Sequence, residues 1–282
     1  MAKKKRMIHD FYRMKQDGEK ITFLTSYDYP TAQFAEAAGM DMLLVGDSLG
    51  MCVYGYPGTV PVAMDQCIRH AEAVRRGAPN TFVVGDMPFM SYQSSIEKAV
   101  ENAGRFLKEA GCDAIKLEGG VRVAPQIRAI VDAGIIVMGH IGLTPQSSGQ
   151  LGGHKAQGRT LESARMVVED AHAVQKAGAH MILLEAIPPE VAGYIRRTLA
   201  IPALSIGAGL DCDGQLLIVS DMIGQFQAFT PKFVKKYCNV AEVITAAMKQ
   251  YVSEVRASEF PEDEHCYHML PGELEKFQAE YK

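Results

Sequence analysis

The chain has 282 residues, of which 48% are hydrophobic and 22% charged, a balance typical of one globular domain with a sizeable core. Its 29 basic and 33 acidic side chains give a formal net charge of −4, which argues against a nucleic-acid-binding protein, since such proteins carry a basic surplus. No apolar run approaches the roughly 20 residues of a membrane span. Six isolated cysteines without a Cys-x-x-Cys pair favour a reduced protein of the cytoplasm.

The basic segment at the N-terminus, residues 1–6, opens a short extension (1–10) that precedes the first predicted strand. An acidic, polar stretch follows where a signal peptide would need apolar residues, so secretion is not expected. We expect this segment to be a solvated, frayed terminus, and a contact with nucleic acid or acidic lipid is the less favoured alternative.

A recurring pattern, Ala-Gly shortly before an apolar run, organises the middle of the chain. It begins at residues 38, 110, 133 and 177. A helix that ends on a left-handed glycine and is followed by a strand buried on both faces gives this pattern, which is typical of a parallel sheet. Strands are expected near residues 21–27, 42–46, 81–86, 114–118, 136–141, 181–185, 203–207 and 216–220. Amphipathic helices are expected at residues 31–38, 64–76, 94–110, 125–133, 161–177 and 189–199.

Eight strands with intervening helices predict an α/β fold, one (β/α)₈ TIM barrel that occupies residues 1–282 as a single domain. A doubly wound sheet is the alternative, but the segment after the first strand lacks the Gly-x-Gly-x-x-Gly turn. Residues 231–257 continue with helical periodicity, and we expect them to pack on the barrel or on a neighbouring subunit. The tail, from about residue 258 to 282, is polar and is expected to be extended.

Four carboxylates end or closely follow predicted strands, and a lysine and a histidine accompany them: Asp47, Asp86, Glu118, Glu185, Lys116 and His140. In a barrel of this kind such positions meet at one mouth, where the active site lies. Clustered carboxylates repel one another in a partly dry pocket unless a cation lies among them, and oxygen ligands favour Mg²⁺. Taken singly, each residue also fits a structural role: a turn or helix cap, a rim ion pair for Lys116, a core histidine for His140. Four acidic strand ends together favour the functional interpretation.

Two glycine-rich segments are expected at the same mouth. The polar loop 144–158 has the length and composition of a lid or a substrate-binding loop, under which a co-substrate would lie. Gly207-Ala208-Gly209 follows the seventh strand, where many barrels bind phosphate, although a tight turn explains it equally well.

The phrases GDSLGM, VGDMPFMSY, IKLEGG, MGHIGLTPQS and SIGAG, in this order, resemble the 3-methyl-2-oxobutanoate (ketopantoate) hydroxymethyltransferase family over about residues 12–256. The resemblance implies a barrel of the phosphoenolpyruvate/pyruvate type, one Mg²⁺ per subunit and a homodecamer built as a pentamer of dimers. It also implies hydroxymethyl transfer from the co-substrate 5,10-methylenetetrahydrofolate to 3-methyl-2-oxobutanoate, which gives 2-dehydropantoate in pantothenate (coenzyme A) biosynthesis.

The resemblance assigns metal-binding roles to three of these carboxylates. Asp47 and Asp86 match the family's metal-binding aspartates, and Glu118 matches its metal-associated glutamate. The Mg²⁺ would act as a Lewis acid that stabilises the enolate of the keto acid.

The resemblance also assigns the substrate contacts and the base. The keto-acid contacts fall on Asp47, Ser48, Asp86 and Lys116, and His140 matches an active-site histidine that is expected to contact the substrate. Glu185 matches the proton acceptor, and the apolar residues before it favour a partly desolvated, more basic carboxylate.

Two other functions fit parts of this pattern. A Mg²⁺-dependent carbon–carbon lyase or mutase of the isocitrate-lyase and phosphoenolpyruvate-mutase superfamily shares the barrel, the metal and the enolate, although the Lys-Lys-Cys-Gly-His loop usual in isocitrate lyases is absent. A barrel without activity, retained for assembly or ligand binding, is expected to lose carboxylates from its strand ends, and all four remain.

Overall fold

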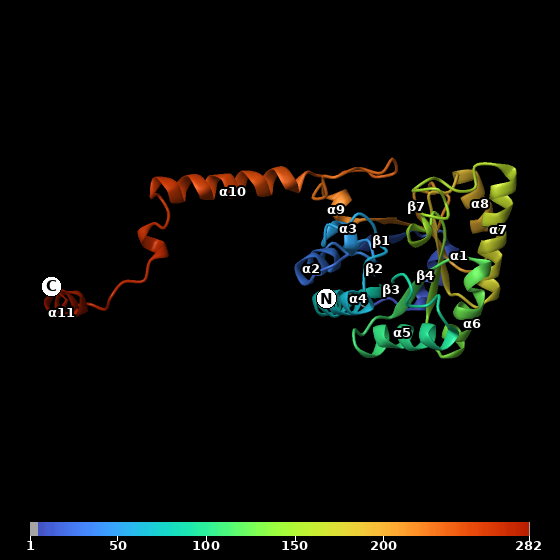
Figure 1. Ribbon diagram of the computed structural model, residues 1–282, viewed down its shortest axis with the longest axis horizontal. Helices are drawn as coiled ribbons and strands as arrows, with labels where there is room; N and C mark the ends of the chain where they lie inside the picture. The colour runs from blue at the N-terminus through green and yellow to red at the C-terminus, as the bar shows by residue number, and fades with distance from the viewer. Residues whose placement is uncertain (1–4, 282) are drawn as a thin grey trace.

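A computed structural model describes residues 5–281 and contains the predicted barrel of eight parallel strands (Figure 1). Each strand pairs with the next one along the chain, and the eighth closes on the first. The strands are β1 (Ile21–Thr25), β2 (Met42–Val45), β3 (Phe82–Asp86), β4 (Ala114–Glu118), β5 (Val137–Gly142), β6 (Met181–Glu185), β7 (Ala203–Ile206) and β8 (Gly214–Leu217). Their positions confirm the expected ranges to within a few residues.

Helices cover the outer face of most of the barrel (Figure 1). They are α2 (Tyr29–Ala37), α4 (Met64–Gly77), α5 (Ile96–Lys108), α6 (Ala124–Asp132), α7 (Leu161–Lys176) and α8 (Pro189–Thr198), with a short α3 (Leu49–Cys52) after β2. Apolar side chains form one core between these helices and the sheet and a second core inside the barrel. Ser95 caps α5, since its hydroxyl accepts a hydrogen bond from the backbone N–H of Lys98.

The N-terminal extension forms a helix, α1 (Ile8–Asp17), which closes the lower end of the barrel. Phe11 and Met14 are fully buried in the inner core, and the rings of Phe11 and Phe82 pack edge to face with their centroids 5.1 Å apart. Before the helix, Lys5 pairs with Asp113. The expectation of a frayed terminus is therefore wrong for Lys5 and Arg6, because both form ion pairs with the barrel, Arg6 with Asp41 at 2.8 Å. Residues 1–4 lie outside the described part of the chain.

An aspartate two residues after the Ala-Gly pair, at positions 41 and 113, links adjacent strands at this same end of the barrel. Asp41 accepts a hydrogen bond from the backbone N–H of Thr22 in β1, and Asp113 accepts one from Val83 in β3, both at 2.9 Å. These carboxylates satisfy N–H groups at the strand starts that would otherwise be buried without a partner.

Asp213, just before β8, makes the most extensive of these contacts. Its carboxylate accepts hydrogen bonds from the backbone N–H of Ala203 in β7 (2.9 Å), from Lys15 of α1 (2.8 Å) and from the Arg196 guanidinium of α8 (2.7 Å). The Asp213 side chain is 1% exposed. One carboxylate thus joins two helices to the bottom of the sheet.

The last quarter of the barrel departs from the expected alternation. In the described residues no helix lies between β7 and β8, and only the four-residue α9 (Val219–Met222) follows β8. The long helix α10 (Val240–Ala257) begins nine residues later than its periodicity suggested, extends away from the barrel and has no buried residue (Figure 1). The expectation that residues 231–257 pack on their own barrel is therefore wrong for α10 and correct for the stretch before it, where Phe233 packs against the inner core. Packing of α10 on a neighbouring subunit stays a prediction.

The C-terminal segment is only partly the extended tail that its polar composition suggested. It contains a short 3₁₀ turn (Asp263–His265) and a helix, α11 (Glu273–Glu280), which lies far from the barrel in Figure 1. None of the helices in the described residues is both long and apolar enough to cross a membrane.

Candidate active site

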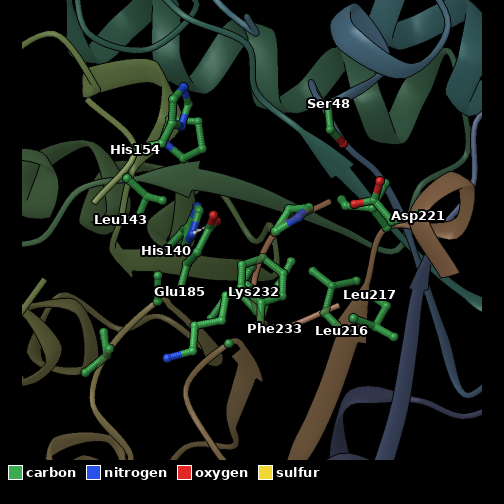
Figure 2. Close-up of a pocket in the computed structure, with 18 of the residues that line it drawn as sticks. Ser48, His140, Leu143, His154, Glu185, Leu216, Leu217, Asp221, Lys232 and Phe233 are labelled. Carbon is green, nitrogen blue, oxygen red and sulfur yellow. Dashed lines mark ion pairs between the residues drawn. The ribbon is translucent and has the colours of Figure 1, made fainter. Parts of the chain in front are cut away.

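The C-terminal ends of the strands surround a cavity of about 1300 Å³. All seven residues that the sequence singled out line it: Asp47, Ser48, Asp86, Lys116, Glu118, His140 and Glu185. Figure 2 shows Ser48 on one side of the cavity, with His140 and Glu185 across from it. The six strand-end residues therefore meet at one mouth, as their positions predicted, and Ser48, which only the resemblance had indicated, joins them there.

Strand register sets the contacts on the cavity floor. Asp86 of β3 pairs in register with Lys116 of β4, and their side chains form an ion pair of 2.8 Å. Two residues further along β4, on the same face, the Glu118 carboxylate lies 3.8 Å from the Lys116 ammonium. These three side chains are buried, so the lysine lies among carboxylates with almost no solvent.

Burial raises the pKa of each carboxyl group on this floor. The pKa of Asp86 lies well above its usual value through desolvation, and the pKa of Asp47 is raised by desolvation and by repulsion from Glu118. Desolvation alone would lower the pKa of Lys116, but the surrounding carboxylates outweigh it, so that its pKa is raised. One lysine thus faces three carboxylates, and a further cation would relieve their repulsion.

The donor groups fit a magnesium ion held by two carboxylates. Asp86 accepts a hydrogen bond at Oδ2 from the Asp47 backbone N–H (2.9 Å), so the two residues touch, and its Oδ1 forms the ion pair with Lys116. Glu118 is already engaged, since its Oε2 accepts from the backbone N–H of Gln146 (3.0 Å). Within residues 5–281 no three Asp, Glu, His or Cys side chains form a ready metal cage. Mg²⁺ suits such a site, because it commonly takes one or two carboxylates and fills its other positions with water and substrate.

Gln146 and Tyr92 hold these carboxylates in place, and sequence reasoning gave neither of them a role. The Gln146 amide donates to Asp47 Oδ2 (2.9 Å) and to the backbone carbonyl of Met87 (3.0 Å). The Tyr92 hydroxyl donates to the Gln146 side-chain oxygen (2.7 Å) and accepts from the Glu118 backbone N–H (3.1 Å). Both residues belong to motifs that carried the family resemblance, and this was their only signal in the sequence.

His140 and Glu185 form the opposite wall. Burial lowers the pKa of His140 and the charge of Lys116 lowers it further, so the imidazole is neutral near neutral pH. Its Nδ1 lies 3.3 Å from both the Lys116 ammonium and Glu118 Oε1, so Nε2 is the ring nitrogen that faces Glu185. This nitrogen lies 3.1 Å from Glu185 Oε2, although off the axis of a hydrogen bond. Glu185 is less buried than the residues of the floor, with 14% of its side chain exposed.

A glycine makes room for Glu185. Gly142 at the end of β5 has φ +93°, and a Cβ there would lie 2.3 Å from the Glu185 backbone oxygen. No L side chain fits this approach without strain, so the glycine fixes how closely the ends of β5 and β6 pack.

The two glycine-rich segments contribute differently to the mouth. His154 and Ala156 of the 144–158 loop line the cavity, consistent with a substrate-binding loop. At Gly207 a Cβ would lie 2.6 Å from the ring of Phe233, so an aromatic side chain covers this turn. The segment thus forms a packed turn, and because Gly207 and Gly209 also line the cavity, phosphate binding there stays a prediction.

Comparisons with known proteins agree with the motifs. The sequence model of a family described as "Ketopantoate hydroxymethyltransferase" matches residues 5–263. A protein of Alkaliphilus metalliredigens (strain QYMF) named 3-methyl-2-oxobutanoate hydroxymethyltransferase is 63% identical over 284 residues, 100% of both chains. A relative of the same name from Moorella thermoacetica is 52% identical over 268 residues, 95% of this chain and 100% of the relative.

Solved structures agree with the barrel of the phosphoenolpyruvate/pyruvate type. Phosphonopyruvate hydrolase in complex with oxalate and Mg²⁺ has a TM-score of 0.61 at 13% identity, covering 98% of this chain and 96% of that chain. The 2,3-dimethylmalate lyase, a phosphoenolpyruvate mutase/isocitrate lyase superfamily member, has a TM-score of 0.58 at 18% identity, covering 98% and 99%. At these identities the likeness concerns the fold alone.

Proposed function

The chain belongs to the ketopantoate hydroxymethyltransferase family, and we propose that it transfers a hydroxymethyl group from 5,10-methylenetetrahydrofolate to 3-methyl-2-oxobutanoate, giving 2-dehydropantoate for pantothenate synthesis. Family membership makes it a hydroxymethyltransferase; the donor and the mechanism are the proposal. The observation that carries it is the arrangement of charges in the cavity. A buried Lys116 among carboxylates lies on the floor, and a separate carboxylate, Glu185, lies on the wall.

We assign one Mg²⁺ per subunit to Asp47 and Asp86, whose contact and shared burial support a common cation. When bound, the ion supplies Lewis-acid stabilisation of the negative charge that develops on the keto acid. Glu118 accepts a hydrogen bond from the Gln146 backbone N–H. It lies beside the two metal ligands and holds the residues around them in position.

The chain's own groups then orient the keto acid and move its proton. Lys116 adds a fixed positive charge beside the substrate carboxylate. The Ser48 hydroxyl, within 2.8 Å of the Tyr27 hydroxyl, donates a hydrogen bond to the substrate. Glu185 removes the C3 proton. The imidazole of His140 lies beside Glu185 and stays neutral, so it adds no charge next to the base. The resulting enolate forms a bond to the methylene carbon of the donor as one of the two C–N bonds of that carbon breaks. The second C–N bond then breaks, water supplies the hydroxyl oxygen, and tetrahydrofolate leaves with its nitrogen atoms protonated.

We further propose that the enzyme works in the cytoplasm as a homodecamer, a pentamer of dimers, without membrane or nucleic-acid partners. The free cysteines among the described residues agree with a reducing compartment. The apolar side chains exposed on α10, such as Val243 and Met248, supply surface for contacts between subunits. Sedimentation velocity tests the decamer directly, and a stable monomer would contradict it.

Proton exchange tests the role of Glu185. Glu185→Gln is expected to abolish exchange of the substrate C3 proton with D₂O while Mg²⁺-dependent binding of the keto acid persists, because an amide binds but takes no proton. Glu190→Gln, which changes an exposed carboxylate five residues later, is the matched control and is expected to exchange at the normal rate. Retained exchange in Glu185→Gln would remove this residue from the base role.

A further inference from the structure

Asp221 is a buried carboxylate that the proposed reaction leaves unused. It lies in α9, directly after β8, is 6% exposed and lines the cavity. Within residues 5–281 no hydrogen bond or ion pair engages its carboxylate, and only the charge of Lys236 acts on it from a distance. The carboxylate therefore faces the cavity, where it can accept hydrogen bonds from a ligand.

The side chains around Asp221 indicate what kind of ligand would fit there. In Figure 2 the carboxylate lies on the same side of the cavity as Ser48, with Leu216 and Leu217 nearby. Phe226 and Phe233 also line the cavity. The proposed keto-acid site therefore has next to it an apolar wall that suits a flat ring, with a carboxylate at one edge.

The cavity has room for such a molecule. Its volume of about 1300 Å³ exceeds the roughly 300–1,000 Å³ of pockets for drug-sized ligands, whereas the keto acid has only eight heavy atoms. Arg159 and Lys232 also line it, and neither forms an ion pair in the part of the chain that the structure describes. This part of the cavity thus contains a carboxylate, Asp221, that can accept hydrogen bonds from N–H groups of a ligand. It also contains two cations, Arg159 and Lys232, that can pair with acidic groups of the ligand.

We propose that Asp221 binds the pterin ring of the one-carbon donor, an inference that rests on the proposed function. The 2-amino group and N3–H of a pterin point the same way, as the two donors of a guanidinium do, and match the two oxygens of one carboxylate. The ring lies along the apolar wall, and its N5 edge, one fused ring away from Asp221, faces the keto acid at Ser48. The glutamate carboxylates of the donor meet Arg159 and Lys232.

The pKa of Asp221 agrees with this role. Desolvation raises it above its usual value, and no hydrogen bond from the described residues offsets this effect. Two donors from a ligand would supply what the protein does not.

The test compares Asp221→Asn with Asp211→Asn, which changes an exposed carboxylate between β7 and β8. Binding of tetrahydrofolate and of 6-methyltetrahydropterin, which has no glutamate tail, is measured by calorimetry. Asp221→Asn is expected to weaken both by about 10- to 100-fold, because a charged, two-point contact is lost. Donor-free C3 exchange reports the keto-acid half of the site and is expected to continue, and Asp211→Asn is expected to behave as the unaltered protein. Asp221→Ser, a second small replacement, is expected to give the same pattern.

Three results would overturn the assignment: unchanged binding of the pterin by both Asp221 variants, a loss confined to tetrahydrofolate, or loss of donor-free exchange together with binding. The proposed function fails separately. An unaltered enzyme that binds the pterin but forms no 2-dehydropantoate would refute the reaction, whereas unchanged pterin binding in the variants refutes only the role of Asp221.

Discussion

The contacts of Asp213 predict that the lower end of the barrel can be weakened without touching the site. Asp213→Ala removes the acceptor for the Ala203 N–H. It also leaves two cations, Lys15 and Arg196, without their carboxylate partner at the bottom of the sheet. The catalytic cavity lies at the opposite ends of the strands, so the change is expected to lower stability and leave C3 exchange by the folded enzyme intact.

The size of this loss follows from burial. A backbone N–H left without a partner costs about 1–3 kcal/mol, and removing one member of a buried ion pair costs about 3–5 kcal/mol. Lys15 and Arg196 are 12% and 31% exposed, so water recovers part of their interaction. The net expectation is a loss of about 3–5 kcal/mol in the free energy of unfolding, or roughly 10 °C in Tm.

Urea unfolding followed by circular dichroism measures the loss. Asp213→Asn keeps an oxygen for the Ala203 N–H and is expected to lose about half as much, which separates the backbone contact from the charge. Asp132→Ala, which removes the exposed partner of Arg128, is the control and is expected to change nothing measurable. A loss below about 1 kcal/mol in Asp213→Ala would refute the claim that this carboxylate joins the elements around it.

Three further predictions concern the site and a buried thiol. Gln146→Ala frees Asp47 from its hydrogen bond, so the Mg²⁺ concentration that half-activates C3 exchange is expected to rise about tenfold or more; an unchanged titration would contradict this. Gly142→Ala forces a Cβ against the Glu185 backbone and is expected to lower Tm and slow exchange together, whereas an unaffected Tm would show that the strand ends can separate freely. Burial raises the pKa of Cys112 to about 12, so this thiol is expected to resist alkylation at pH 8 until the protein unfolds. Because the unfolded thiol ionises near pH 8.5 and the folded one does not, the free energy of unfolding is expected to fall as pH rises from about 8.5 towards 12, and a flat profile would contradict the shift.

The sequence alone determined the barrel and the floor of its site. Short apolar runs preceded by Ala-Gly predict parallel strands buried on both faces, because only such strands need no polar alternation. Once eight of them close a barrel, the residues at their ends must meet at one mouth, and Asp86, Lys116 and Glu185 did so. Local pattern and topology were enough for these residues, since each one lies on a strand.

Tertiary structure decided the contacts that no periodicity encodes. Gln146 and Tyr92 orient the carboxylates through hydrogen bonds between segments far apart in the chain, and Asp221 became visible only through its burial without a partner. The sequence likewise predicted that α10 is helical from its periodicity, but it did not predict that the helix extends away from the barrel. A repeat in the sequence reports which face of an element is apolar, whereas what covers that face depends on the rest of the fold.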